Sequence, residues 1–67
     1  MEYYSTSHIV DGQLIEQKGL YIDGLTHAKQ ASFNKMEAEP DIEAVILYGT
    51  DGSAHICYKG GKYERKN

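Results

Sequence analysis

Several residue types are scarce in this 67-residue chain, and each scarcity excludes a class of protein. Cys57 is the only cysteine, so no disulfide can close within the chain. A lone thiol in a small protein also favours a reducing compartment. No apolar run approaches the ~18 residues that a membrane span needs, and no basic-then-apolar leader opens the sequence. We therefore expect a cytoplasmic protein with no membrane segment.

The chain is short enough for a single domain over residues 1–67, and it has no excess of basic residues. Its formal net charge is −3. Residues 37–53 carry five acids and no base, whereas residues 54–67 carry four bases and one acid. Nucleic-acid-binding domains are usually strongly basic, so the acidic total argues against that class. The basic C-terminal segment leaves a local phosphate contact open.

Glycine divides this sequence into its elements. Asp11-Gly12, Asp51-Gly52 and Gly60-Gly61 are signals for short hairpins, because both central residues of a type I′ turn need positive φ. Asp23-Gly24 stands where an alternating segment changes into a helical one. These four positions predict the order of the elements.

Five segments have the β-branched and aromatic content of strands. The first two cover residues 2–10 and 13–22, and Lys18-Gly19 within the second predicts a β-bulge. The others cover residues 42–48, 53–58 and 62–64, and residues 65–67 are expected to fray. The run from Ala44 to Tyr48 is apolar at every position, which predicts a strand at the centre of the sheet.

One helix is predicted over residues 25–38. Asp23 is its expected N-cap, with Thr26 as a weak capping partner. Glu39-Pro40 ends it, because the residue before proline disfavours the α conformation. Its apolar stripe consists of Leu25, Ala28, Ser32 and Met36. The expected fold class is α+β, in the order β-β-α-β-β with a short fifth strand, and the helix covers one face of a mostly antiparallel sheet.

His55 and Cys57 share one face of a predicted strand, and His8 can join them from another strand. Zinc sites usually show paired short spacings such as Cys-x-x-Cys, which this sequence does not contain. Catalysis by the thiol would need an orienting acid, an oxyanion hole and an enclosed pocket. We therefore expect packing roles for these three residues, with no enzyme activity, metal or cofactor.

Six tyrosines stand beside one phenylalanine and no tryptophan. Tyrosine offers a large contact area with a polar tip, so it is favoured at protein interfaces. It is also a common strand residue, and we assign about half of the six to that role alone. One helix cannot cover both faces of a sheet. The uncovered face therefore has to carry apolar and aromatic side chains, and we expect it to meet a partner.

Two short motifs carry a family resemblance. Leu25-Thr26-His27-Ala28-Lys29 opens the predicted helix, and Tyr58-Lys59-Gly60-Gly61-Lys62-Tyr63 closes the chain. With the segment from Val45 to Thr50, they resemble small phage-encoded anti-CRISPR proteins of β-β-α-β-β architecture that act on type I-F surveillance complexes. Similar layouts also occur in small bacterial domains of unknown function. The resemblance implies a protein that docks on the backbone Cas subunits and obstructs hybridisation of target DNA to the guide RNA.

The resemblance places Lys29 among helix residues that contact the Cas protein, and Tyr58, Lys59 and Lys62 in the matching terminal hairpin. Our first hypothesis is a stoichiometric protein-binding inhibitor in the cytoplasm, which is the host cytoplasm if a phage encodes it. Two alternatives stay open, a nucleic-acid module with stacking tyrosines and a homodimeric structural domain. The predicted partner-binding residues are Lys29, Gln30, Lys35, Tyr58, Lys59, Lys62 and Tyr63.

Overall fold

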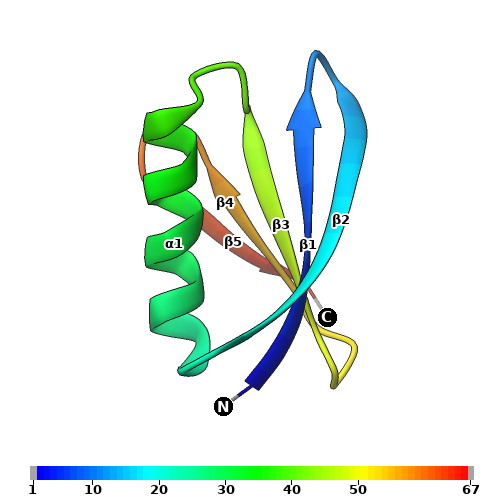
Figure 1. Cartoon of the computed structure of the whole chain (residues 1–67). Helices are drawn as coiled ribbons and strands as arrows, with labels where there is room; N and C mark the ends of the chain where they lie inside the picture. The colour runs from blue at the N-terminus through cyan, green and yellow to red at the C-terminus, as the bar shows by residue number, and fades with distance from the viewer. Residues whose placement is uncertain (1, 67) are drawn as a thin grey trace.

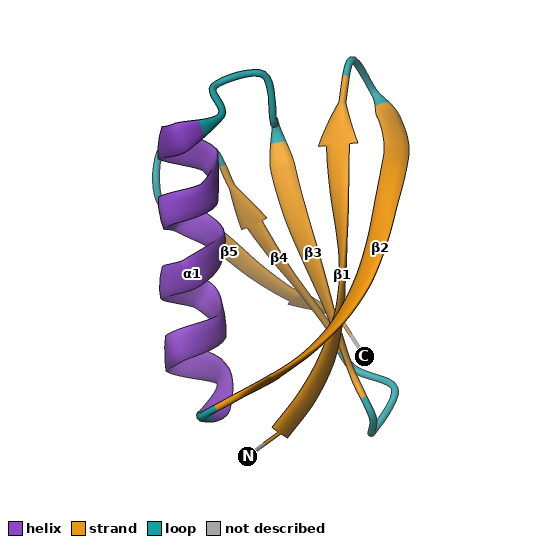
Figure 2. Ribbon diagram, in the orientation of Figure 1, coloured by secondary structure: helices purple, strands orange, loops and turns teal. Residues whose placement is uncertain are grey.

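The computed structural model describes residues 2–66, apart from the side chains of residues 16, 17 and 20–22. The elements are β1 (Glu2–Val10), β2 (Gln13–Ile22), α1 (Gly24–Ala38), β3 (Ala44–Gly49), β4 (Ala54–Tyr58) and β5 (Lys62–Lys66). The five strands form one sheet in the order β2-β1-β3-β4-β5, and every neighbouring pair is antiparallel. The helix lies against one face of that sheet (Figures 1 and 2). The predicted α+β class and element order are confirmed.

Two of the three predicted hairpin turns have the expected backbone. Asp11 and Gly12 have φ of 52° and 74°, and Gly60 and Gly61 have φ of 90° and 86°. The turn between β3 and β4 differs, because Gly52 is its only residue with positive φ. The Gly52 amide donates to the Gly49 carbonyl at 3.2 Å, so four residues make this turn. The prediction of a type I′ turn at Asp51-Gly52 is therefore wrong.

The predicted bulge at Lys18-Gly19 is also wrong. These residues pair regularly with Thr6 and Ser5, whereas the register shifts between His8 and Ile9 and leaves Ile15 unpaired. Gly19 has a different role, because a Cβ there would collide with the Tyr3 side chain. Glycine thus makes room for a tyrosine ring on a neighbouring strand, an arrangement that pins strand pairing. The predicted apolar side chains of residues 20–22 lie outside the described part of the chain.

The last strand is longer than predicted. Arg65 and Lys66 pair with His55 and Ala54, so the fraying expected for these two residues is wrong, and Asn67 lies outside the described residues. The backbone groups of β4 extend the pairing, since its five residues all find partners on β5. The third and fourth strands begin at Ala44 and Ala54, slightly later than predicted.

The helix begins one residue earlier than predicted. Asp23 occupies the N-cap, but its side chain makes no capping hydrogen bond. Its carbonyl instead lies 2.6 Å from Nδ1 of His27, one turn along the helix. Glu39 is the C-cap, as predicted, and its amide donates to the Lys35 carbonyl at 2.9 Å. The predicted stripe is confirmed, because the buried helix residues are Ala28, Ser32 and Met36.

The core lies between the helix and the sheet. It consists of Tyr4, Ala28, Met36, Ile42, Val45, Leu47 and Cys57, with Val10, Leu25 and Phe33 packed around it. Cys57 is completely buried. Because side chains alternate along a strand, Val45 and Leu47 facing the helix require their neighbours on β3 to face away from it. The sheet therefore has a covered helix face and an uncovered one.

Candidate functional site

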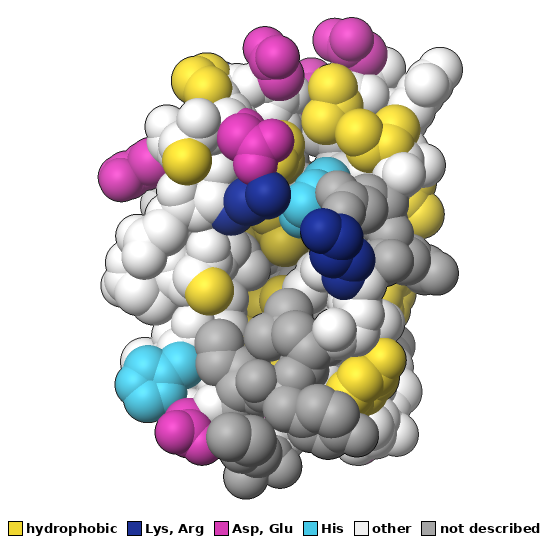
Figure 3. Space-filling model, viewed as in Figure 1, with side chains coloured by type: hydrophobic (Ala, Val, Ile, Leu, Met, Phe, Trp, Pro, Cys, Tyr) yellow, Lys and Arg dark blue, Asp and Glu magenta, His cyan; other side chains and the backbone are white. Residues whose placement is uncertain are grey.

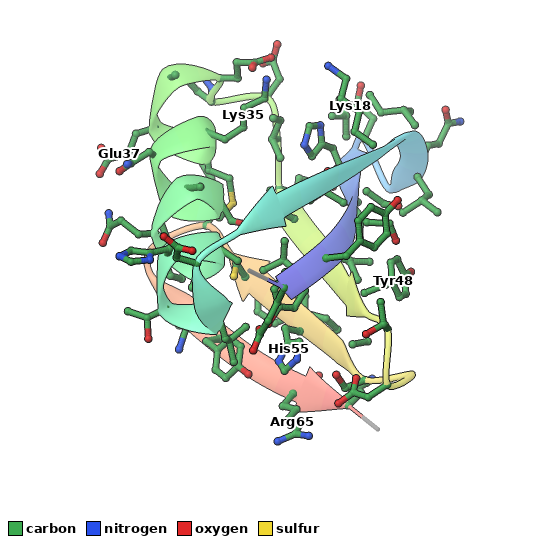
Figure 4. All side chains as sticks on the ribbon, turned by 60° about the horizontal axis from the view of Figure 1, so that its bottom comes forward. Lys18, Lys35, Glu37, Tyr48, His55 and Arg65 are labelled. Carbon is green, nitrogen blue, oxygen red and sulfur yellow. The ribbon has the colours of Figure 1, made fainter. Side chains whose placement is uncertain are left out.

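The face of the sheet opposite α1, which we call the open face, is the first candidate site. Its described side chains come from every strand through alternation and register: Tyr3, Ser5, Ser7, Ile9, Leu14, Ala44, Ile46, Tyr48, Ala54, Ile56, Tyr58, Lys62, Glu64 and Lys66. Tyr48 points away from the helix in Figure 4. The single helix of the described chain lies on the other side of the sheet (Figure 1).

The middle of the open face is apolar. Ile46 of β3 lies directly opposite Ile56 of β4, and Tyr58 lies in the next row, opposite the small and buried Ala44. Such direct cross-strand pairs place Cβ atoms about 5 Å apart, so these side chains form one continuous surface. Ile46 and Ile56 are partly exposed, and the exposed fraction of Tyr58 is 37%. An uncovered aliphatic and aromatic surface of this kind usually marks an interaction site.

One border of the open face is charged. Lys62, Glu64 and Lys66 of β5 point to this side, because they pair with Tyr58, Ile56 and Ala54 respectively. Nζ of Lys66 lies 3.6 Å from Oε1 of Glu64. These groups are exposed, so their pairing contributes little to stability. Their arrangement gives the apolar centre a rim with one more positive charge than negative.

The helix face carries a chain of polar side chains near the β3–β4 turn. Oγ of Ser53 donates to Oδ1 of Asp51 at 2.6 Å and lies 3.1 Å from Nε2 of His55. Nδ1 of His55 lies 2.6 Å from the hydroxyl of Tyr63. Nζ of Lys29 lies 3.8 Å from the centre of the Tyr63 ring. This series of polar side chains thus joins the β3–β4 turn to the edge strand β5. The contact between Lys29 and Tyr63 joins the series to α1.

The hydrogen bonds that link Tyr63, His55, Ser53 and Asp51 all run in one direction, from Tyr63 toward Asp51. The Ser53 hydroxyl has a single proton, which goes to Asp51, so its oxygen accepts from the Nε2–H of His55. Nδ1 of a neutral imidazole then accepts from the Tyr63 hydroxyl. Burial lowers the pKa of His55, and the positive charge of Arg65 lowers it further, which agrees with the neutral ring. The hydrogen bonds from Ser53 lower the pKa of Asp51.

This polar chain lacks the proton arrangement of a nucleophilic site. A triad needs a histidine between the nucleophile and the acid, so that the imidazole can accept the hydroxyl proton. Here Ser53 lies between His55 and Asp51, and both nitrogens of His55 are already engaged. The neighbouring cleft of about 330 Å³ is open to solvent. The geometry therefore fits a structural link between strands.

The predicted partner-binding residues lie in several places. Tyr58 and Lys62 are neighbours on the open face, whereas Lys29 and Tyr63 contact each other on the helix side. Of the other three, Gln30 donates to Oδ1 of Asn34 at 3.0 Å on the outer side of the helix. Lys35 pairs with Glu39 at 2.5 Å, and Lys59 donates to the Pro40 carbonyl at 2.5 Å. The structure thus brings four of these seven residues together as two pairs, and the other three make their printed contacts with residues outside the set.

His8, His55 and Cys57 share the helix face, as their spacing predicts. Val45 of β3 separates His8 from Cys57, and burial raises the pKa of the Cys57 thiol. Among the side chains that the structure describes, no three of His, Cys, Asp or Glu are grouped so that they could hold a metal ion. A buried thiol with a raised pKa is a poor nucleophile at neutral pH.

Ile46, Tyr48 and Ile56 of the open face were not among the predicted site residues. The run from Ala44 to Tyr48 is apolar on both faces, so its pattern does not tell which alternate positions the helix covers. A partial signal existed, because the row that includes Tyr58 and Lys62 continues along β4 into Ile56. The choice of face depends on where the helix lies.

Within residues 2–66, no helix combines the length and the apolar character that crossing a membrane requires. Comparisons with family models, with curated proteins and with solved structures found no match to this chain.

Proposed function

We propose that this chain is a non-enzymatic binding domain that docks on another protein through its open face. The observation that carries the proposal is the continuous surface of Ile46, Ile56 and Tyr58, which no described element covers. Tyrosine at the edge of an apolar patch suits protein recognition, because its ring is rigid and its hydroxyl can hydrogen-bond to a partner. An apolar centre with a polar rim is the usual anatomy of such an interface.

The rim indicates the chemistry of the partner. Lys62 and Lys66 flank Glu64 along β5, so the complementary surface is an apolar patch bordered mainly by carboxylates. Charged rims of this kind contribute more to orientation and association rate than to affinity. Binding should therefore slow at high salt while much of its affinity, which comes from the apolar centre, is retained.

The resemblance to type I-F anti-CRISPR proteins gives the proposal its specific form. In that form the chain is a phage-encoded inhibitor in the host cytoplasm. It docks on the backbone Cas subunits of the surveillance complex, and the complex then fails to pair target DNA with its guide RNA. The sequence motifs at Lys29 and at Tyr58 to Tyr63 support this form. The open face adds a surface through which the docking would occur.

A competition experiment tests the specific form. Purified type I-F surveillance complex is mixed with labelled target DNA and increasing amounts of the chain, and bound DNA is measured by gel shift. We expect the chain to abolish DNA binding, and Tyr58→Asp and Lys62→Glu to lose at least about tenfold in potency. Asp11→Asn, on the exposed β1–β2 turn, is the control and should inhibit like the original chain. Undiminished DNA binding at a saturating concentration of the chain would contradict the proposal that it is an anti-CRISPR inhibitor.

Two further results show which surface docks and whether the bound molecule is a foreign protein or a second copy of this chain. If Lys29→Glu loses potency and Tyr58→Asp does not, the helix side docks and the open face does not. Sedimentation of the chain alone at micromolar concentration reports whether copies associate. A dimer that Tyr58→Asp dissolves would assign the open face to a second copy and contradict docking on a foreign protein.

A further inference from the structure

The outer edge of β5 is a second surface with the geometry for pairing with another chain. β5 is the last strand in the sheet order, and among the described strands it pairs only with β4. All five of its residues, Lys62–Lys66, are exposed. Alternate residues of an antiparallel strand direct their N–H and C=O groups to opposite sides, so one set points away from β4. Backbone groups of this kind are a template on which a further strand can add.

The side chains of this edge are mainly cationic. Lys62, Arg65 and Lys66 are basic, and Glu64 is the one acid of β5. Nζ of Lys66 lies 3.6 Å from Oε1 of Glu64, and the two side chains are 66% and 49% exposed. An ion pair this exposed is weak, so Lys66 is accessible to another carboxylate.

Most of the acidic side chains visible in Figure 3 lie around the end of the molecule where α1 ends and β1 turns into β2. Arg65 of β5 lies toward the opposite end in Figure 4. Asp51 is the acid whose charge interacts with Arg65, and its carboxylate already accepts hydrogen bonds from Ser53. An incoming carboxylate therefore meets a local excess of positive charge at β5, although the whole chain carries −3.

The order of charges along β5 disfavours pairing with a second copy of itself. If two copies paired antiparallel over all five residues, Lys62 would lie opposite Lys66, and Glu64 would lie opposite Glu64. Like charges directly opposite each other destabilise a pair of strands. Lysines on an exposed edge commonly prevent such self-association. The backbone groups of β5 thus remain accessible to a strand of opposite charge, whereas a copy of β5 is repelled.

We propose that the outer edge of β5 binds an extended acidic segment of another protein, which adds to the sheet as an antiparallel strand. Backbone hydrogen bonds supply the affinity in this mode of recognition, and alternate side chains supply the specificity. On the open-face side, carboxylates of the segment lie opposite Lys62 and Lys66. On the helix side, a carboxylate lies opposite Arg65 and a β-branched residue lies opposite Tyr63.

The test uses the peptide Thr-Glu-Glu-Thr-Val-Glu-Thr with both ends blocked, whose five central residues match β5 from Lys66 back to Lys62. The ¹⁵N-labelled chain is titrated with this peptide and its amide chemical shifts are followed. We expect saturable shifts that centre on residues 62–66, with a dissociation constant on the order of 1 mM. The charge-reversed peptide Thr-Lys-Lys-Thr-Val-Lys-Thr should bind at least about tenfold more weakly. Equal binding of the two peptides would overturn the proposal.

Two N-methylated forms of the acidic peptide test whether its backbone pairs with β5. N-methylation removes a hydrogen-bond donor and places a methyl group where a neighbouring strand would lie. One form carries methyl groups on one set of alternate residues, and the other form carries them on the intervening residues. We expect one form to lose binding and the other, whose methyl groups face solvent, to keep it within about twofold. Equal affinities of the two forms would contradict strand addition.

Charge variants connect the binding to β5. Lys62→Glu with Lys66→Glu should weaken binding of the acidic peptide at least about tenfold, and this variant should bind the charge-reversed peptide instead. Lys18→Glu with Lys35→Glu makes the same change in net charge on β2 and α1, and it should bind the acidic peptide like the original chain. Equal losses in the two double variants would contradict recognition by β5.

Two further outcomes concern the open face and the occupant of the edge. Ile46→Ala changes the open face two strands away from β5 and should leave peptide binding intact, so this proposal and docking through the open face can fail separately. Concentration-dependent shifts of the β5 amides without peptide would assign the edge to a second copy and overturn the proposal.

Discussion

The two faces of the sheet differ strongly in burial, although the same strands supply the side chains of both. On β3, Val45 and Leu47 are 2% and 1% exposed, whereas Ile46 between them is only partly buried. The three residues have similar hydrophobicity, so composition does not separate their roles. The difference comes from α1, which covers one set of alternate positions. The side chains on the helix face are therefore buried and contribute most to the free energy of unfolding, whereas those on the open face remain accessible to a partner.

The polar groups reverse the usual expectation for these faces. The covered face holds the Asp51–Ser53–His55–Tyr63 chain, whereas the middle of the uncovered face is apolar. Buried polar groups are tolerated where each has a hydrogen-bond partner, and this chain satisfies that condition. For the exposed apolar side chains of the open face, no contact within the described structure gives a comparable explanation. The contrast supports a structural role for the polar chain and a binding role for the open face.

The largest expected effect separates the faces by stability. Leu47→Ala should lower the free energy of unfolding by about 2–5 kcal/mol, because it leaves a cavity beneath the helix. A domain of this size has about 3–10 kcal/mol in total, so this loss is a large share of its stability. Ile46→Ala on the open face should lose only about 1 kcal/mol. Urea denaturation measures both, and equal losses would mean that the faces are equally buried.

The next effect is a pH dependence that arises on the helix face. The folded state holds His55 neutral, so its pKa lies below the value of about 6.5 in the unfolded chain. The unfolded state thus binds more protons in acid. The contribution of His55 to stability is complete above pH 6.5 and is lost as the pH falls toward the lower folded pKa. The slope reaches at most about 1.4 kcal/mol per pH unit.

Urea midpoints between pH 7.5 and pH 5 measure this slope. His55→Gln should reduce it, and the difference isolates His55 from His8 and His27. Identical slopes would contradict a neutral, buried ring. The charged and titratable groups around His55 are Glu2, Tyr4, Lys29, Asp51, Tyr63 and Arg65. Tyr4 stays protonated throughout this range, because its hydrogen bond to Glu2 and its burial raise its pKa to about 12.

A smaller effect compares two tyrosines on opposite faces. Tyr63→Phe removes the hydroxyl that donates to Nδ1 of His55 and should cost about 1 kcal/mol. The contact of the ring with Lys29 is retained in this variant. Tyr58→Phe should leave stability nearly unchanged. Thermal unfolding distinguishes them, since 1 kcal/mol corresponds to roughly 4–8 °C in a domain of this size. A larger shift for Tyr58→Phe would contradict the structural role of the polar chain.

The smallest effect compares two buried serines. Ser7 on the open-face side is fully buried, and its hydroxyl has no hydrogen-bond partner among the described residues. Ser32 on the helix donates to the Ala28 carbonyl at 2.9 Å. Ser7→Ala should be neutral or stabilise the chain by up to about 1 kcal/mol, whereas Ser32→Ala should destabilise it slightly. Urea denaturation in parallel checks the signs, and a clear loss for Ser7→Ala would reveal a partner for its hydroxyl.

Much of the fold could be predicted because its signals are local. The Asp11-Gly12 and Gly60-Gly61 turns need positive φ, and both have it. The stripe from Ala28 to Met36 follows helical spacing, and it is buried. The errors lie where pairing between strands decides. Ile15 carries the bulge in place of Lys18-Gly19, and Arg65 is held by β4 instead of fraying.

The candidate site was less predictable for the same reason. Tyr58 and Lys62 were predicted through the motif of the terminal hairpin, and a hairpin brings such residues together whatever the rest of the chain does. Ile46 and Ile56 come from β3 and β4, and they became a surface only when the helix covered the alternate positions. The partners of Tyr63 were hidden too, because His55 and Lys29 approach it from different elements.

The sequence by itself determined the number and order of the elements, through turn glycines and periodic apolar positions that act over a few residues. The tertiary structure alone decided which face of the sheet is covered, where the bulge lies and which side chains hydrogen-bond to His55. Those features depend on contacts between residues far apart in the chain, and alternation along a strand is the same whichever face the helix chooses.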